Sequence, residues 1–160
     1  MKRINLGTGE MAVAQEPGVV LQTLGLGSCV AVIILEPSLR IVGMAHVALP
    51  DSSIDEDKAR VLPGYFADTG LVRLMDLMFG QGRHGLSVLA KLVGGASVMD
   101  SKGTFNIGAR NALAIKKILW KHRIAILGED LGGNHSRSVS VDVCEGRVVV
   151  TGPNGVKHEI

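Results

Sequence analysis

Short apolar runs of strand length dominate the first third of the chain. Met11–Ala14 and Val19–Leu24 are two such runs, and the segment 30–48 contains two more around a central turn. Because 30–48 is apolar at successive positions, we predict a hairpin that is buried on both faces, between two layers. Pro17-Gly18 and Glu36-Pro37-Ser38-Leu39 are the turns that we expect to reverse the chain.

Helical periodicity appears at two places. We predict a helix over Tyr65–Phe79, ended by Gly80 and Gly82, because its apolar residues recur every three to four positions. Its buried face consists of Leu71, Leu74, Met75 and Met78. A second helix is predicted over Ile107–His122, with Asn106 as N-cap. It would bury Ala112, Ile115 and Leu119.

Basic residues gather on the other face and at the end of this second helix, at Arg110, Lys116, Lys117, Lys121 and Arg123. Lysines near a helix C-terminus suit the helix dipole, so a solvated face is one interpretation. A docking surface for an acidic partner is the alternative.

The remaining segments predict more strands and two irregular regions. Strands are expected at Leu86–Val93, Ile124–Leu127, Ser138–Cys144 and Arg147–Thr151, the last two joined by a two-residue turn at Glu145-Gly146. We expect the polar segment 51–64 to be a connecting loop and the tail 152–160 to be frayed. The sum is seven or eight short strands and two helices. It predicts one α/β domain over residues 1–160, a layered sandwich with mixed, largely antiparallel sheets.

Composition narrows the class of protein. Seventeen basic and fifteen acidic side chains give a net charge of +2, which favours neither a nucleic-acid partner nor membrane insertion. The N-terminus has no apolar stretch of signal-peptide length, and the chain has only two cysteines, so we expect a cytoplasmic protein with free thiols. The GLGSC stretch lacks GxGxxG spacing and a P-loop lysine. We therefore predict no cofactor.

The candidate chemistry lies in the glycine loop and hairpin. If Leu35 and Arg40 close a four-residue turn, Cys29 directly faces His46, with Cβ atoms roughly 4.5–5.5 Å apart. A thiol beside an imidazole can become a nucleophile, with its pKa lowered by the imidazole. Gly25, Gly27 and Ser28 precede the cysteine and can offer free backbone amides to an oxyanion.

Other interpretations of the pair remain open at this point. A five-residue turn would place His46 on the opposite face from Cys29. A cysteine among valines is commonly a small core residue, and a strand histidine commonly a satisfied polar one. A metal site would need a further histidine, but His84, His122, His135 and His158 show no ligand spacing, and we predict no metal. Cys144 has no such loop around it, and we assign it no chemistry.

Five motifs in order resemble the chemoreceptor glutamine deamidase family, CheD. They are TLGLGSCVAV with GMAHVALP, KLVGGASVM, FNIGARNALAI, AILGEDLGGNHSRSV and GRVVVTG, and they extend from about Val19 to Gly152. One departure is visible, because the family more often has glycine where Ser136 stands. Asn106, Gly108, Arg110 and Asn111 match family positions, and we interpret them as helix-start architecture.

The resemblance implies a fold, an activity and a site. The fold would be similar to the catalytic domain of the cytotoxic necrotizing factors. The activity would be deamidation of glutamine side chains on chemoreceptor cytoplasmic helices, with receptor methylesterase activity in some members. Cys29 and His46 match the nucleophile and base, with Gly27 and Ser28 as loop support. Thr23 matches the third member, although the residues alone do not distinguish it from Gln22 or Ser28.

The family resemblance also implies a CheC-type chemotaxis phosphatase as a partner of some members. The alternative to an enzyme is therefore a non-catalytic protein that binds and regulates such a phosphatase. Its thiol would then be vestigial. Retention of Thr23, Cys29 and His46 together argues against this alternative. Binding by a Cys29→Ala protein would separate the two roles.

Overall fold

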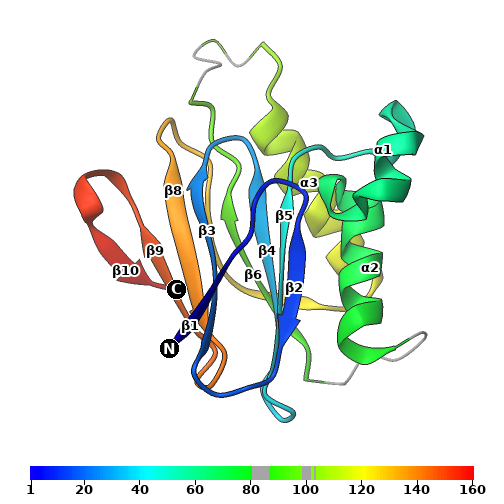
Figure 1. Cartoon of the computed structure of the whole chain (residues 1–160). Helices are drawn as coiled ribbons and strands as arrows, with labels where there is room; N and C mark the ends of the chain where they lie inside the picture. Colours follow the sequence, from blue (N-terminus) through cyan, green and yellow to red (C-terminus); the bar gives the residue numbers. More distant parts are fainter. Residues whose placement is uncertain (81–86, 99–101, 103) are drawn as a thin grey trace.

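Two five-stranded sheets and a layer of helices make up the fold in the computed structural model, which describes residues 1–80, 87–98, 102 and 104–160. Sheet A has the strand order β1-β3-β8-β9-β10, and sheet B has the order β2-β5-β4-β6-β7. Figure 1 shows the sheets packed face to face, with the helices on the far side of sheet B. Sheet B is therefore the middle layer, and it positions the candidate site.

Sheet A leaves its outer face to solvent. Its strands are β1 (Lys2–Asn5), β3 (Val19–Leu26), β8 (Arg137–Asp142), β9 (Arg147–Thr151) and β10 (Lys157–Glu159). Buried and partly exposed residues alternate along β8, as expected for a strand with one wet face. The pair β1–β3 is parallel, and the other pairs in this sheet are antiparallel.

Sheet B is covered on both sides. Its strands are β2 (Met11–Ala14), β4 (Val30–Glu36), β5 (Ile41–Val47), β6 (Leu89–Gly94) and β7 (Ala125–Leu131). Every residue of the central strand β4 is buried, which agrees with its continuous apolar sequence. The strands β6 and β7 are parallel, and helix α3 (Ile107–Lys121) lies between them in sequence as a crossover.

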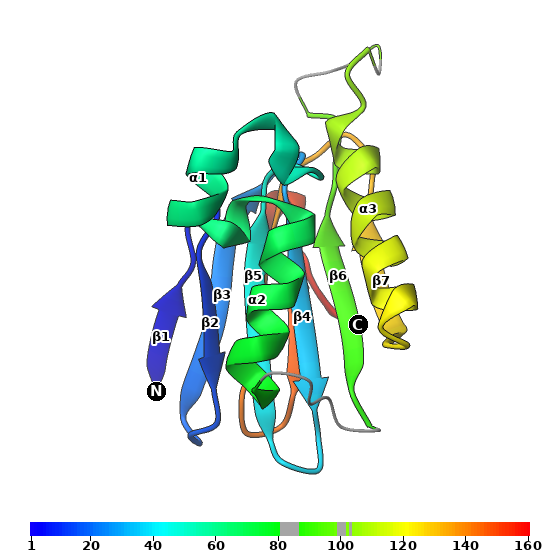
Figure 2. The same ribbon diagram turned by 90° about the vertical axis from the view of Figure 1, so that its right-hand side faces the viewer.

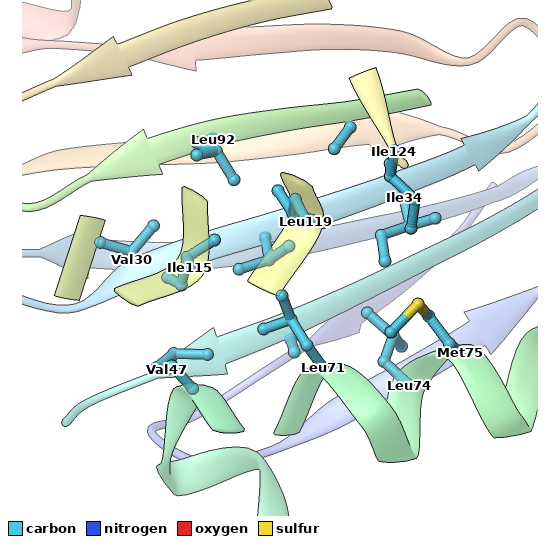
Figure 3. Packing of buried hydrophobic residues seen from close by; sticks show 14 of the residues in the cluster. Val30, Ile34, Val47, Leu71, Leu74, Met75, Leu92, Ile115, Leu119 and Ile124 are labelled. Carbon is cyan, nitrogen blue, oxygen red and sulfur yellow. The ribbon is translucent and has the colours of Figure 1, made fainter. Parts of the chain in front are cut away.

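The helical layer consists of α1 (Glu56–Val61), α2 (Ala67–Phe79) and α3, with single turns of 3-10 helix at Ser52–Ile54, Pro63–Tyr65 and Pro153–Gly155. Figure 2 shows α2 and α3 side by side across sheet B. Their buried faces meet β4, β5 and β6 in one apolar cluster, which includes Leu71, Leu74, Ile115 and Leu119 (Figure 3). A second apolar cluster fills the space between the two sheets. Within the described ranges, none of the helices has the length and apolar character needed to cross a membrane.

The layered, largely antiparallel α/β class predicted from the sequence is confirmed, but three local predictions are wrong and one strand was missed. The segment 51–64 contains α1, because the carboxylates of Asp51 and Asp55 accept backbone N–H bonds at helix starts. Residues 2–5 form β1, which was not predicted. The tail is not frayed, since β10 pairs with β9. The β8–β9 turn has four residues, 143–146, closed by the Asp142–Arg147 pair.

The predicted N-cap and buried face of α3 are confirmed only in part. Asn106 is the N-cap of α3, but it adopts a left-handed conformation and its side chain makes no capping hydrogen bond. Ile115 and Leu119 are fully buried, whereas Ala112 is only partly so. Leu86, the predicted start of β6, and Gly82, a predicted helix stop, lie outside the described residues.

The central hairpin is shifted from the predicted register by two residues. Glu36 pairs with Ile41, so the four-residue turn is 37–40 and Ala31, not Cys29, faces His46. The Glu36 carboxylate is buried and accepts bonds from the backbone and hydroxyl of Ser38, which holds Glu36 in the ladder and starts the turn one residue later. A shift of two preserves the face of every side chain. Cys29 and His46 therefore still belong to the same face, as diagonal neighbours.

Candidate active site

Thr23 and His46 bond to each other across the space between the two sheets, and Cys29 packs against the apolar cluster that fills this space. Thr23 lies on β3 of sheet A, and His46 lies on β5 of sheet B; both are buried. Cys29 immediately precedes β4 and is half-buried. Diagonal neighbours on one sheet face are within reach of side-chain contact. The two sheets thus each supply part of the site.

The hydrogen bonds of Thr23 determine the tautomer of His46. The Thr23 hydroxyl donates its only proton to the Leu6 carbonyl at 2.7 Å, so it can only accept at its 2.8 Å contact with Nδ1 of His46. The Leu6 carbonyl also lies 3.3 Å from the same nitrogen, and a carbonyl can only accept. Nδ1 must therefore carry the hydrogen. In the neutral ring, Nε2 is left with a free lone pair.

The segment just after β1 holds the backbone of His46. The amide of Gly9 donates to the His46 carbonyl at 2.7 Å, and the His46 amide donates to the Glu10 carbonyl at 3.0 Å. The carbonyl of Leu6, which bonds the Thr23 hydroxyl, belongs to the same segment. Residues 6–10 therefore hold both the main chain and the ring of the histidine.

Burial favours the neutral form of both candidate side chains. It raises the pKa of the Cys29 thiol, an effect partly opposed by a hydrogen bond from the residue's own backbone amide. Burial also lowers the pKa of His46, against the opposing effects of the Leu6 carbonyl and the charge of Glu10. His46 is not among the causes that shift the Cys29 pKa here, so the lowering expected from the sequence stays a prediction for the substrate-bound state. A neutral imidazole has no charge to stabilise a thiolate, and no hydrogen bond joins the two side chains in the described part of the chain.

Glycines let three backbone segments approach one another around Cys29. A Cβ on Gly94, whose φ is +121°, would lie 2.2 Å from the Cys29 carbonyl oxygen. A Cβ on Gly108, in the first turn of α3, would lie 2.4 Å from the Gly95 carbonyl oxygen. The amides of Gly95 and Ala96 bond the carbonyls of Cys29 and Gly27, both at 2.9 Å. The glycines of KLVGGASVM and FNIGARN thus serve to hold the cysteine loop against β6 and α3.

Asn111 connects the two segments that carry Cys29 and His46, a role not predicted from the sequence. Its side-chain amide, fully buried on α3, donates to the Ser28 carbonyl at 3.0 Å and to the Ala48 carbonyl at 2.9 Å. It therefore bonds the residue before Cys29 and the second residue after His46. The signal was present, because Asn111 continues the buried stripe of Ile115 and Leu119 at i, i+4 and i+8. An amide on such a face needs buried hydrogen-bond partners.

A pocket of about 500 Å³ opens at Cys29. Its walls are Gly27, Ser28, Cys29, Ala96, Ser97, Val98, Phe105, Ile107 and Gly108. The apolar side chains and exposed loop backbone suit the aliphatic stem and terminal amide of a glutamine. A larger hollow of about 580 Å³ lies over the strands of sheet A and contains none of the three candidate residues.

The segment that contains Ser136, where the family more often has glycine, has a structural role. Arg137 is buried, and its guanidinium bonds the Asp130 side chain and the Gly132 carbonyl, whereas Ser136 is exposed. Cys144 lies exposed in the β8–β9 turn. Across the described residues, no three His, Cys, Asp or Glu side chains are grouped to hold a metal ion.

Comparison with known proteins gives one consistent result. A family model described as CheD chemotactic sensory transduction matches residues 48–152. The chain is 48% identical to the probable chemoreceptor glutamine deamidase CheD of Syntrophotalea carbinolica, over the full length of both. It is 46% identical to the chemoreceptor glutamine deamidase CheD of Thermotoga maritima, over 94% of this chain and 91% of the relative. The family-model match begins after His46, whereas the first relative covers the whole candidate site.

Proposed function

Because this chain belongs to the CheD family of chemoreceptor glutamine deamidases, we propose that it hydrolyses glutamine side-chain amides of chemoreceptors. The products are glutamate and ammonia. The substrate segments are the receptors' cytoplasmic helices, so the reaction takes place in the cytoplasm. Cys29, His46 and Thr23 carry out the chemistry, and no cofactor is required.

The first step joins the thiol to the amide carbon. As the Cys29 sulfur attacks, its proton passes to Nε2 of His46, which the hydrogen bonds of Nδ1 leave as the free base. The carbonyl oxygen gains negative charge and needs backbone donors. The backbone amide of Cys29 and the Gly27-Ser28 loop border the pocket where this oxygen would lie.

The second step breaks the carbon–nitrogen bond. The His46 imidazolium returns its proton from Nε2 to the leaving nitrogen, ammonia departs, and a thioester to Cys29 remains. Nε2, again unprotonated, then takes a proton from water as the water attacks the thioester, and returns it to the Cys29 sulfur as the carbon–sulfur bond breaks. The carboxylic acid that forms loses its proton to solvent. Glutamate and the free thiol result, so one water is consumed for each ammonia released.

The observation that carries the proposal is the chain of bonds from Leu6 through Thr23 to His46. It supports Thr23 over Gln22 or Ser28 as the third member, because Thr23 is the one whose side chain bonds the imidazole. The test is to measure ammonia release and the mass change of a chemoreceptor cytoplasmic fragment incubated with the protein. An unmodified fragment would refute the activity.

The proposal includes two further roles that the family resemblance implies. A glutamyl methyl ester is a better electrophile than an amide, so the thioester route extends to receptor ester hydrolysis. A CheC-type phosphatase is the second proposed partner. Capture of such a phosphatase by the Cys29→Ala protein would separate binding from catalysis.

Replacing Thr23 by valine is expected to lower kcat by about 10²–10³-fold, because the imidazole loses its main acceptor and its fixed orientation. Thr23→Ser retains the hydroxyl and should keep most of the activity. Steady-state kinetics on the receptor fragment would compare the two variants. Equal activity of the valine and serine proteins would contradict the assigned role of the hydroxyl.

The pH dependence should show a neutral pair rather than a preformed ion pair. His46 must be unprotonated to act as base and its pKa is lowered, so kcat/KM should fall only below pH of about 6.5. Alkylation of Cys29 by iodoacetamide, in a Cys144→Ser background, should accelerate through a pKa above that of a free cysteine. Rapid, pH-independent alkylation near neutrality would instead indicate a stable thiolate–imidazolium pair.

A further inference from the structure

The outward face of α3 exposes large apolar side chains. Leu113 is 54% exposed and Trp120 is 84% exposed, whereas Asn111, Ile115 and Leu119 on the opposite face are fully buried. Figure 2 shows this outward face without another element over it. An exposed tryptophan is uncommon on a surface that contacts only water, and tryptophan is enriched among residues that dominate binding energy.

The same face is strongly basic. The stretch 106–128 has five lysines and arginines and no acidic residue. Lys116 pairs with Glu129 at 2.9 Å, and cations near the end of a helix suit its dipole. Arg110 is not explained in this way, because it lies in the first turn, where the dipole disfavours a positive charge. The local charge is thus suited to an acidic partner.

These residues form one line that leads to the pocket. Arg110, Leu113, Lys117, Trp120 and Lys121 recur at intervals of three or four positions, or follow directly, and all are exposed; we call them the α3 stripe. Ile107 and Gly108, one turn earlier, line the pocket at Cys29. The stripe extends about 15 Å along the helix from Arg110 to Trp120, at 1.5 Å per residue.

We propose that the α3 stripe docks an acidic, amphipathic helix of the protein substrate, whose target glutamine then reaches Cys29. This inference rests on the proposed function, which it extends from the pocket to a second contact. An apolar ridge on the substrate helix packs against Leu113 and Trp120, while carboxylates beside that ridge face Lys117 and Lys121. The docked segment and the glutamine are therefore parts of one substrate surface.

Trp120 itself reports the docking, because it is the only tryptophan in the chain. Its fluorescence can be followed as the Cys29→Ala protein is titrated with a tryptophan-free receptor fragment. Burial should shift the emission to shorter wavelength. A fragment that binds, by an independent sedimentation measurement, without changing the emission would overturn the inference.

Kinetics of the catalytically intact protein give the second test. Trp120→Ala, and the pair Lys117→Glu with Lys121→Glu, should each raise KM for the receptor fragment about tenfold or more and leave kcat unchanged. Hydrolysis of a short unstructured glutamine peptide should not change. Controls away from the stripe are Leu39→Ala, at an exposed apolar side chain, and Lys2→Glu with Lys157→Glu, at two exposed lysines.

The outcomes separate this inference from the proposed function. If the native protein deamidates the fragment and the stripe variants match the controls, the docking surface is refuted and the activity stands. If the native protein releases no ammonia but the stripe variants weaken fragment binding, the surface stands and the activity is refuted. If the native protein neither binds the fragment nor releases ammonia, both the docking surface and the activity are refuted.

Discussion

Cys29→Ala protein is expected to release no measurable ammonia from a chemoreceptor fragment, a loss of about 10⁴-fold or more. His46→Ala should lose nearly as much, because burial keeps the thiol protonated and no other group in the described network is oriented to remove its proton. Losses from residues that act as a unit do not add, so the double variant should be no worse than either single one. Mass spectrometry of the fragment would report all three.

A second thiol in the same chain provides the control. Cys144 lies exposed in the β8–β9 turn, and Cys144→Ala should deamidate at the native rate. Circular dichroism of each variant would show that the fold is retained, since removing a half-buried sulfur disturbs packing little. Full activity of Cys29→Ala would mean that the nucleophile lies elsewhere.

Gly94→Ala is expected to destabilise the protein by about 3–5 kcal/mol, the largest stability effect of any single methyl group we consider. The added Cβ would lie 2.2 Å from the Cys29 carbonyl oxygen, and φ of +121° is a conformation that alanine rarely adopts. Relief would require the strand end and the cysteine loop to separate. Urea denaturation would give the free energy of unfolding, and an activity assay would show whether the surviving fold still holds Cys29 in place.

Gly18→Ala is the matched control for this substitution. Gly18 also has positive φ, +85°, but apart from Gly18 and its two chain neighbours no heavy atom of the described residues lies within 4 Å of the position where a Cβ would stand. Gly18→Ala should therefore lower the free energy of unfolding only through backbone strain, by about 1–2 kcal/mol. Equal destabilisation by the two alanines would contradict the close approach of Gly94 to Cys29.

Strands and helices with uniform patterns were predictable from the sequence. The unbroken apolar run of β4 indicated a strand buried on both faces. The apolar residues of α2 recur every three to four positions, which indicated a helix buried on one face. β1 and β10 were not predictable in this way. Both are short edge strands with mostly exposed residues, and they exist because a neighbouring strand offers backbone hydrogen bonds.

The candidate site was predicted in part, and its missing pieces have a common cause. The alternation of side chains preserved the shared face of Cys29 and His46 even though the turn moved. Thr23 came from the family resemblance, because nothing in a sequence reveals which strand of one sheet will cross which strand of another. The roles of Leu6 and Asn111 depend on hydrogen bonds to distant main-chain groups, which leave no local pattern.

The division of the site between two sheets has a consequence for the newly synthesised chain. Thr23 occupies an interior strand only after Val139 of β8, near the end of the chain, pairs beside it. Pairings between such distant segments form late, because closing a long loop costs entropy before any contact repays it. Until β8 is in place, β3 lacks one of the two neighbouring strands that hold Thr23, the residue whose hydroxyl accepts the His46 Nδ1 hydrogen. Under the proposed mechanism, hydrolytic competence therefore requires β3 to be held between β1 and β8.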